Sequence, residues 1–473
     1  HGETLHLERP NIYEFEKALI AIGMEESDAK RFALSTGRSW TVFRRQRATN
    51  LSIRHPAWLN AVQSSSLCLL CLLGSWNADK EADRQVVEQL ADRPYVDIER
   101  DLKQLAQLDD APLLSIGTVW KAKSPLELLN LFGGRITRSE LDRFFLIARE
   151  MLIAPDPQLE LPEEERYAAA VYGKVHPHSG LLFESVCDSL VKLAVRGSEQ
   201  PGLMALGIEA RVAHFVHELL DNADARRWLS LASHLPMLAE AAPTVFLTAV
   251  EKSLRLPEAP VTQLLMESRT SGMGGRCWHA GLLWALETLA WAPSQLARVA
   301  LILARLSHTP ITSNWSNTPG RSLFALFRSW LPKTAAGLQD RIKVLDLLIK
   351  KEPDAAFGVL DGLTEPGQQF AFDAARPKWR EDDAGAGKGV TYAEMNEMHA
   401  AAKVRLFQMS AGNPSRIVTL FQNTSKKEPS DVFPVLSLME PFTTPTANDD
   451  DREILRKALR ETIRWHRNHD DTP

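Results

Sequence analysis

Histidine and cysteine side chains are the first residues in this sequence that could carry chemistry. His176, His178 and Cys187 lie within twelve positions of one another, a spacing that would suit a zinc site. A fourth ligand is missing, and Cys187 falls on the apolar face of a predicted helix. We therefore interpret this stretch as a turn at Ser179 and Gly180 that leads into the next helix.

A second pair of histidines occurs as H-x-x-H-E at His214, His217 and Glu218. Zinc proteases use H-E-x-x-H, in which the glutamate between the histidines acts as the general base. The order found here misplaces that base, so we interpret both histidines as helix-surface residues. A metal-dependent hydrolase that uses His176, His178, His214 or His217 remains the alternative enzymatic hypothesis.

Two glycine-rich stretches resemble anion-binding loops at first sight. Residues 272–275 precede a predicted helix, whose N–H groups would attract an anion, but no strand precedes them. Residues 385–389 contain Gly-Lys, yet the following residue is Gly389 where a phosphate loop needs Ser or Thr. Acidic residues just upstream would also repel phosphate. We predict a disordered loop over residues 376–390.

Cys68 and Cys71 form a C-x-x-C pair inside an apolar helix. The spacer is Leu-Leu and no second pair exists, so we interpret both as buried core thiols rather than as a metal or redox site. The sequence thus predicts no catalytic residue, no metal ligand and no cofactor-binding residue in this chain.

A cluster of arginines lies between residues 38 and 54, where no acidic residue interrupts it. Arg44, Arg45 and Arg47 form a candidate interaction patch for phosphate or for an acidic protein surface. The alternative is an ordinary solvated helix face. Aromatic side chains are too few among these arginines for a nucleic-acid platform, so we do not expect direct nucleic-acid binding.

Length and composition bound the class of protein. A chain of 473 residues exceeds what one core usually supports, so we expect several domains or a repeat array. A net charge of −5 and four cysteines argue against a polybasic protein and a disulfide framework. The sequence lacks a transmembrane stretch, a signal peptide and an initial Met. We therefore expect a cytoplasmic location, and either a piece of a longer protein or a separate subunit.

Residues 57–134 predict three helices followed by a short hairpin around Gly117. This order is typical of a winged-helix domain. In the helix that would enter DNA, residues 97–110, acidic side chains outnumber basic ones. We therefore predict a regulatory or packing winged helix and not a DNA reader.

Apolar residues at helical spacing dominate from Thr137 onward. The strongest pattern is a helical hairpin at residues 279–330. We interpret the five tryptophans in it and just before it as packing core, namely Trp278, Trp284, Trp291, Trp315 and Trp330. Proline introduces four predicted helices at separations of 50, 60 and 76 residues, namely at Pro243, Pro293, Pro353 and Pro429. The sequence predicts a mainly α fold, with a winged-helix-like domain followed by an irregular helical-hairpin solenoid of the HEAT or TPR kind.

Several stretches resemble the region that follows the ATPase module in large bacterial STAND-type NTPases, including the Avs-like antiphage defence proteins. None of these stretches is a catalytic motif. They are ALSTGRSWTVFRRQ at 33–46, GSWNADKEADRQVVEQLA at 74–91, HSGLLFESVCDSLVKLAVRG at 178–197, HAGLLWALETLAWAPSQLARVALILARL at 279–306 and RSLFALFRSWLPKTAAG at 321–337.

The resemblance implies a domain order and a role. Residues 1–56 would be the end of the NTPase helical lid, 57–134 the regulatory winged helix and 135–473 the sensor. The implied partners are a protein trigger of phage origin, the NTPase and effector modules of the same protein, and further copies on activation. ATP and magnesium are implied for the whole protein and not for this chain. A housekeeping helical scaffold, outside defence, remains a further alternative.

Overall fold

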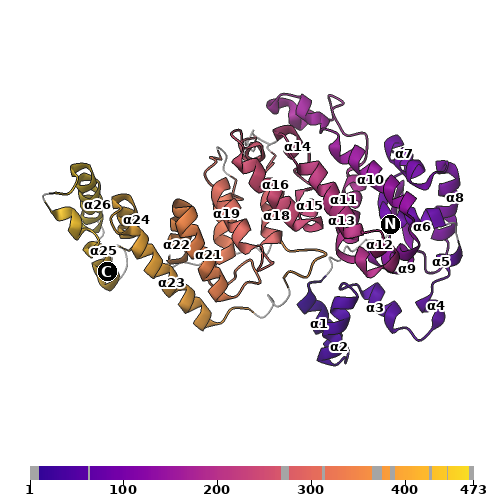
Figure 1. Cartoon of the computed structure of the whole chain (residues 1–473), viewed down its shortest axis with the longest axis horizontal. Helices are drawn as coiled ribbons and strands as arrows, with labels where there is room; N and C mark the ends of the chain where they lie inside the picture. The colour runs from indigo at the N-terminus through magenta and orange to yellow at the C-terminus, as the bar shows by residue number, and fades with distance from the viewer. Residues whose placement is uncertain are drawn as a thin grey trace.

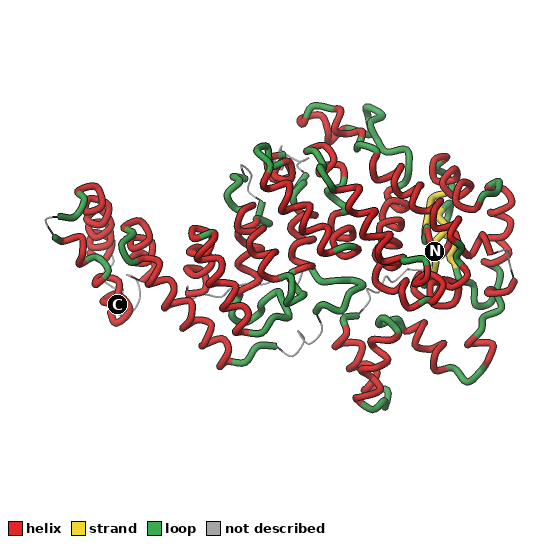
Figure 2. Tube along the Cα trace, in the orientation of Figure 1, coloured by secondary structure: helices red, strands yellow, loops and turns green. Residues whose placement is uncertain are grey.

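The computed structural model describes residues 10–61, 64–267, 276–311, 315–364, 375–383, 389–424, 429–444 and 446–467. Within these ranges the chain is mainly helical, with one small three-stranded antiparallel sheet, so the predicted mainly α class is confirmed (Figure 2). No helix in the described ranges combines the length and the apolar character that crossing a bilayer requires.

The N-terminal helices have a small core of their own. Asn11 precedes apolar residues at helical spacing, which predicts a helix that begins there. The structure confirms this helix, and Asn11 and Glu14 form a capping box at its start. The alternation of Leu5 and Leu7 predicts a short strand, which lies outside the described residues. The helices are α1 (Ile12–Ala21), α2 (Glu26–Ser35), α3 (Trp40–Arg47) and α4 (Leu51–Arg54). The small core consists of Ile12, Phe15, Leu19, Ala29, Ala33 and Phe43.

The sheet lies in the next stretch, where strand β3 pairs with β1 on one side and with β2 on the other. Gly117, with a φ of +58°, turns the predicted β2–β3 hairpin, which is confirmed. Cys68 and Cys71 are buried, as predicted, and burial raises the pKa of both thiols. The elements are α5 (Trp58–Ala61), α6 (Ser64–Leu72), β1 (Ser75–Asn77), α7 (Glu81–Ala91), α8 (Tyr95–Ala106), β2 (Leu113–Ile116), β3 (Val119–Ala122) and α9 (Pro125–Phe132).

The middle of the chain starts with a helix at Thr137. The spacing of Thr137 and Glu140 in the sequence predicts a capping box there, and the structure confirms it. Pro162 and the three glutamates after it suit the start of an α-helix, but the chain forms a 3₁₀ helix there. The helices here are η1 (Gly133–Arg135), α10 (Arg138–Ile153), η2 (Pro157–Glu160), η3 (Glu163–Ala168), α11 (Gly180–Arg196), η4 (Gly197–Glu199), α12 (Pro201–Ala205), α13 (Ile208–Leu220), α14 (Ala225–Ser230), α15 (Leu235–Ala241), α16 (Pro243–Arg255), η5 (Pro260–Thr262) and α17 (Gln263–Met266).

Three of the four predicted proline starts are confirmed in the middle and last parts of the chain. Pro243, Pro353 and Pro429 are the first residues of their helices, whereas Pro293 lies in the turn before α19. The helices are α18 (Ala280–Leu289), α19 (Leu296–Leu306), α20 (Pro319–Phe327), α21 (Leu338–Lys351), α22 (Pro353–Thr364), α23 (Tyr392–Ser410), α24 (Pro414–Thr424), α25 (Pro429–Ser437), η7 (Glu440–Thr443) and α26 (Asp449–Arg467).

Figure 1 shows these helices following one another along the long axis of the molecule, from α10 to α26. Helices close in sequence pack together, as α21 does with α22 and α22 with α23. One large core extends from Val42 to Leu455 and crosses both predicted domain boundaries. Those boundaries and the solenoid therefore stay predictions.

Candidate functional site

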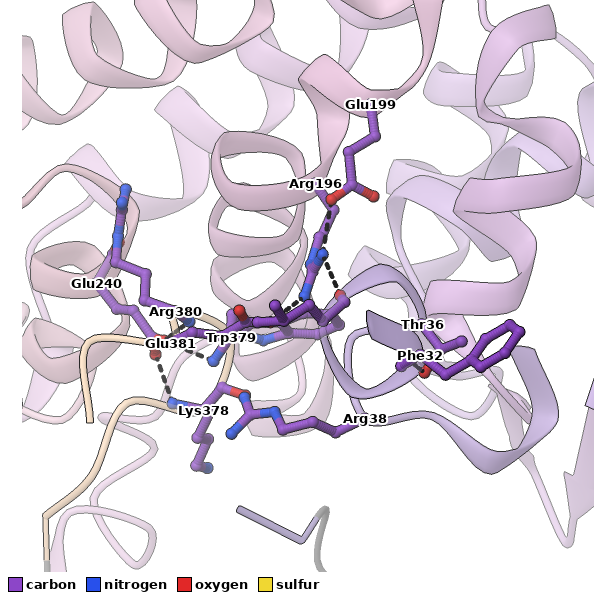
Figure 3. Close-up of polar contacts among 11 residues, drawn as sticks. Phe32, Thr36, Arg38, Arg196, Glu199, Glu240, Lys378, Trp379, Arg380 and Glu381 are labelled. Atoms are coloured by element: carbon purple, nitrogen blue, oxygen red, sulfur yellow. Dashed lines mark hydrogen bonds and ion pairs between the residues drawn. The ribbon is translucent and has the colours of Figure 1, made fainter. Parts of the chain in front are cut away.

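Residues 375–383, which we call the clasp segment, run between α22 and α23 and return to elements that lie much earlier in the chain. Trp379 and Asp383 are buried at 4% and 3% exposure. The prediction of a disordered loop over residues 376–390 is therefore wrong for residues 376–383. Figure 3 shows the segment passing between helices α11 and α15 and the turn that follows α2. Residues 384–388 lie outside the described ranges.

Glu240, near the end of α15, binds the backbone of the clasp segment. Its carboxylate accepts hydrogen bonds from the N–H groups of Lys378 (3.1 Å), Trp379 (2.5 Å) and Arg380 (2.7 Å). Arg380 returns a bond from its Nε to the main-chain carbonyl of Glu240 at 2.7 Å. Three successive N–H groups on one carboxylate resemble an anion site at a helix start, with the protein's own glutamate as the anion.

Arg196, the last residue of α11, connects the clasp segment to the N-terminal helices. Its guanidinium donates to Glu381 (2.7 Å), to Glu199 (2.6 Å) and to the carbonyl of Leu34 at the end of α2 (3.0 Å). Arg38 adds a second connection by donating to the carbonyl of Lys378 at 2.6 Å. The residues joined by this last bond are 340 positions apart.

Two indole N–H groups fix the course of the segment. Trp379 donates to Asp188 of α11 at 2.7 Å, and Trp291 donates to the carbonyl of Ala375 at 2.7 Å. The guanidinium of Arg376 lies 4.4 Å from the centre of the Trp291 ring and also pairs with Asp383. Buried indoles usually need such partners, so the two tryptophans give the segment a defined position.

Burial changes the proton affinities of the charged groups in this site. Burial raises the pKa of Glu240, although the three backbone N–H donors act in the opposite direction. Burial also raises the pKa of Glu381, against the nearby charges of Arg196 and Arg38. The pKa of Arg38 is lowered, again chiefly by burial. The site therefore buries opposite charges, and their burial carries a desolvation cost. Removing one partner would leave the other charge buried and unpaired, which would destabilise the fold.

The predicted arginine patch is only partly at the surface. Arg45 is buried and binds Glu127, Asp110 at 2.7 Å and the carbonyl of Ile53, so it is not available to a partner. Arg44 is half exposed and lies 3.9 Å from Asp110. The guanidinium of Arg47 lies over the Phe32 ring at 5.5 Å. The acidic partners come from residues distant in sequence, which is why the run of arginines looked uncompensated.

The predicted histidine pairs lie at different places. His176 and His178 line a cavity of about 200 Å³ together with His234, Asp156 and Phe183. Burial lowers the pKa of all three histidines. His214 instead lies on the surface of α13 beside Glu218. His217 lines a second, smaller cavity of about 150 Å³.

The next question is whether the described residues include a metal site. No group of three or more His, Cys, Asp or Glu side chains there is placed to hold a metal ion. Cys187 is buried in α11, where burial raises the pKa of its thiol well above the usual range. The glycine-rich stretch at residues 272–275 lies outside the described residues. Among the predicted tryptophan core, Trp278 and Trp291 are buried, whereas Trp284 is 47% exposed.

Sequence reasoning missed Glu240, Arg196 and Trp379. The sequence contains one signal that could have indicated a buried segment. Trp379 is an isolated large aromatic residue in the stretch that we predict to be a disordered loop. Comparison of the chain with known protein families, with curated proteins and with solved structures found no match.

Proposed function

We propose that this chain is the regulatory and sensing region of a larger bacterial ATPase of the STAND type, acting in antiviral defence. A protein trigger, encoded by a phage, binds along the helical array of residues 135–473. Binding shifts the attached ATPase from a closed state to an oligomeric one. The shift cannot exceed the difference in the trigger's affinity for the two states.

The observation that carries this proposal is the clasp segment. It leaves the helical array after α22 and is bonded to α11, α15 and the turn after α2. A movement of the array that displaces residues 375–383 must therefore break bonds that hold the N-terminal helices. Coupling between a sensing surface and a distant module requires a contact that is made in one state and broken in the other, and we propose the clasp segment for this role.

Residues 57–134 support the proposal through their order of elements. The sequence α6, β1, α7, α8, β2, β3, with β3 in the centre of the sheet, is the order expected of a winged helix. The basic residues of α8 are paired within the helix, Arg100 with Asp97 and Lys103 with Glu99. They do not form a positive face for phosphates, which favours a regulatory winged helix over a DNA reader.

The experiment that tests the proposal begins with the gene. The sequence upstream of residue 1 should encode a Walker-type phosphate loop, and deletion of residues 135–473 from the whole protein should abolish phage defence. Purified whole protein should hydrolyse ATP and oligomerise only when lysate from phage-infected cells is added. Wild-type defence after the deletion, or an upstream region without an ATPase, would overturn the proposal.

A further inference from the structure

Residues 156–178, which we call the arm, join α10 to α11 and project from the upper edge of the molecule as drawn in Figure 1. The arm carries four large apolar side chains within nine positions. Their exposed fractions are 75% for Tyr167, 85% for Val171, 53% for Tyr172 and 49% for Val175. Folded monomers rarely leave such a concentration of apolar surface in water unless it binds something.

The arm is held in place despite its exposure. The N–H of Asp156 donates to Ser230 at 3.0 Å, and Arg166 pairs with Glu267 at 2.8 Å, with both side chains less than one-fifth exposed. Short turns continue the 3₁₀ helix, since the N–H of Val171 bonds the carbonyl of Ala168 at 2.8 Å. The exposed side chains are therefore displayed by a folded element, and a partner need not order the arm on binding.

The charges of the arm define the chemistry of a suitable partner. Glu164 and Glu165 lie in the first turn of η3, three and two positions before the exposed Tyr167. The basic residues of the arm are already paired, Arg166 with Glu267 and Lys174 with Glu160 at 2.6 Å. The exposed apolar side chains of the arm thus follow acidic residues along the chain, and this negative charge attracts basic groups and repels an anionic membrane.

Beneath the arm lies the cavity of about 200 Å³ that His176, His178 and His234 line with Phe183. The histidines pack around Phe183, with ring centres 4.5 Å, 5.9 Å and 5.5 Å from it. Each has a buried Nδ1 with no partner among the described residues. An anchoring side chain from a partner could enter such a space, as interface anchors commonly do.

We propose that the arm is the docking surface for a protein partner whose contact face combines large apolar side chains with lysine or arginine. This inference rests on the proposed sensing function, because it names the surface that receives the trigger. Tyrosine and valine supply apolar contact area at a low entropy cost on ordering, and the glutamates steer the basic partner.

The test uses defined peptides and two matched variants. A fluorescein-labelled amphipathic peptide of leucine and lysine is titrated with the full chain, and a leucine–glutamate peptide serves as the charge control. The arm variant is Tyr167→Ser with Val171→Ser. The matched control is Tyr392→Ser with Val404→Ser, which removes the same residue types at 84% and 56% exposure on α23. Circular dichroism verifies that both variants remain folded.

We expect the leucine–lysine peptide to bind the wild type and the α23 variant equally, and the arm variant about tenfold more weakly. Equal binding to the arm variant overturns the inference, as does equal binding of the glutamate peptide. Arm-dependent cosedimentation with vesicles of phosphatidylglycerol would also overturn it. Because no ATPase takes part, a positive result stands even if the wider defence proposal fails.

Discussion

Glu240 shows how much of the structure depends on single side chains with several partners. One carboxylate receives three consecutive backbone N–H groups while its own main-chain carbonyl accepts from Arg380. The side chain is only 4% exposed, so solvent cannot replace these bonds if the acceptor is lost. The position of the clasp segment therefore depends on the charge of this residue.

Replacing Glu240 by Gln tests that dependence. The amide oxygen still accepts, but its NH₂ group faces a backbone donor and leaves at least one N–H unpaired. We expect unfolding free energy to fall by about 1–3 kcal/mol, measured by urea denaturation. The matched control is Glu218→Gln, which removes an exposed pair with Arg149 and should cost less than about 1 kcal/mol. Equal effects of the two substitutions would contradict the role given to Glu240.

The buried side chain of His234 should make the stability of the chain depend on pH. Burial, followed by the nearby Arg276 and His176, lowers its pKa to about 4 in the folded chain, against about 6.5 when unfolded. Between these values the unfolded state binds the extra proton. The stability contribution is therefore complete above about pH 6.5, falls as pH decreases and levels off below about pH 4.

We expect the wild type to lose up to about 2 kcal/mol at pH 5.0 through this residue, relative to pH 7.5. His234→Phe keeps a ring stacked on Phe183, which lies 5.5 Å away with an interplanar angle of 13°. Urea denaturation of both proteins at the two pH values measures the difference. A pH dependence that is identical in wild type and variant would exclude His234 as its source.

At the scale of secondary-structure elements, the close packing of α18 against Ala232 predicts a large effect of adding one methyl group. A Cβ at Gly281, near the start of α18, would lie 1.8 Å from the carbonyl oxygen of Ala232. The obstacle is backbone, so it cannot rotate away. Gly281→Ala should destabilise the chain by about 3 kcal/mol or more, because α18 would have to shift away from Ala232 to make room for the added methyl group.

Gly320 in α20 provides the matched control for Gly281. It is also a helical glycine, but a Cβ there would meet nothing within 4 Å. Gly320→Ala should be neutral or stabilise by up to about 1 kcal/mol, because alanine favours the helix. Thermal unfolding of both variants measures the contrast. Similar melting temperatures for the two would show that α18 can move away from Ala232 without loss.

Local signals in the sequence were enough to predict several elements correctly. The capping boxes at Asn11 and Thr137 start helices where predicted, because all the groups involved lie within four residues. The hairpin at Gly117 and the burial of Cys68 and Cys71 follow from equally local patterns.

Prediction failed where the partner lies far along the chain. Arg45 reads as one of a run of surface arginines, but Glu127, 82 positions later, neutralises it. The low apolar content of the clasp segment predicts a disordered loop. The segment is ordered because it bonds to Glu240 and Arg196, and no local sequence pattern connects these residues with it. Long-range ion pairs follow from the fold and so cannot be read from residue order.

At the scale of the whole molecule, the N-terminal helices are held by two separate sets of contacts. The clasp segment binds the turn after α2 through Arg38, and Arg196 bonds Leu34. The second set belongs to α3, where Arg45 binds Asp110 and Glu127. Helices α1 and α2 share a small core with Phe43 of α3. Because the second set of contacts fixes α3, we expect α1 and α2 to open locally around it when the first set is lost.

Hydrogen exchange can separate these two sets of contacts. In a Glu240→Gln, Glu381→Gln variant we expect exchange in residues 11–37 to accelerate by about tenfold, while α3 and α19 keep their protection. The control variant Glu251→Gln, Glu352→Gln removes two part-buried ion pairs, with Arg298 and Arg305, that include no residue of the clasp segment. It should leave residues 11–37 unchanged. If α1, α2 and α3 instead accelerate together, the clasp segment supports general stability, and coupling between the helical array and the N-terminal helices would lose its structural basis.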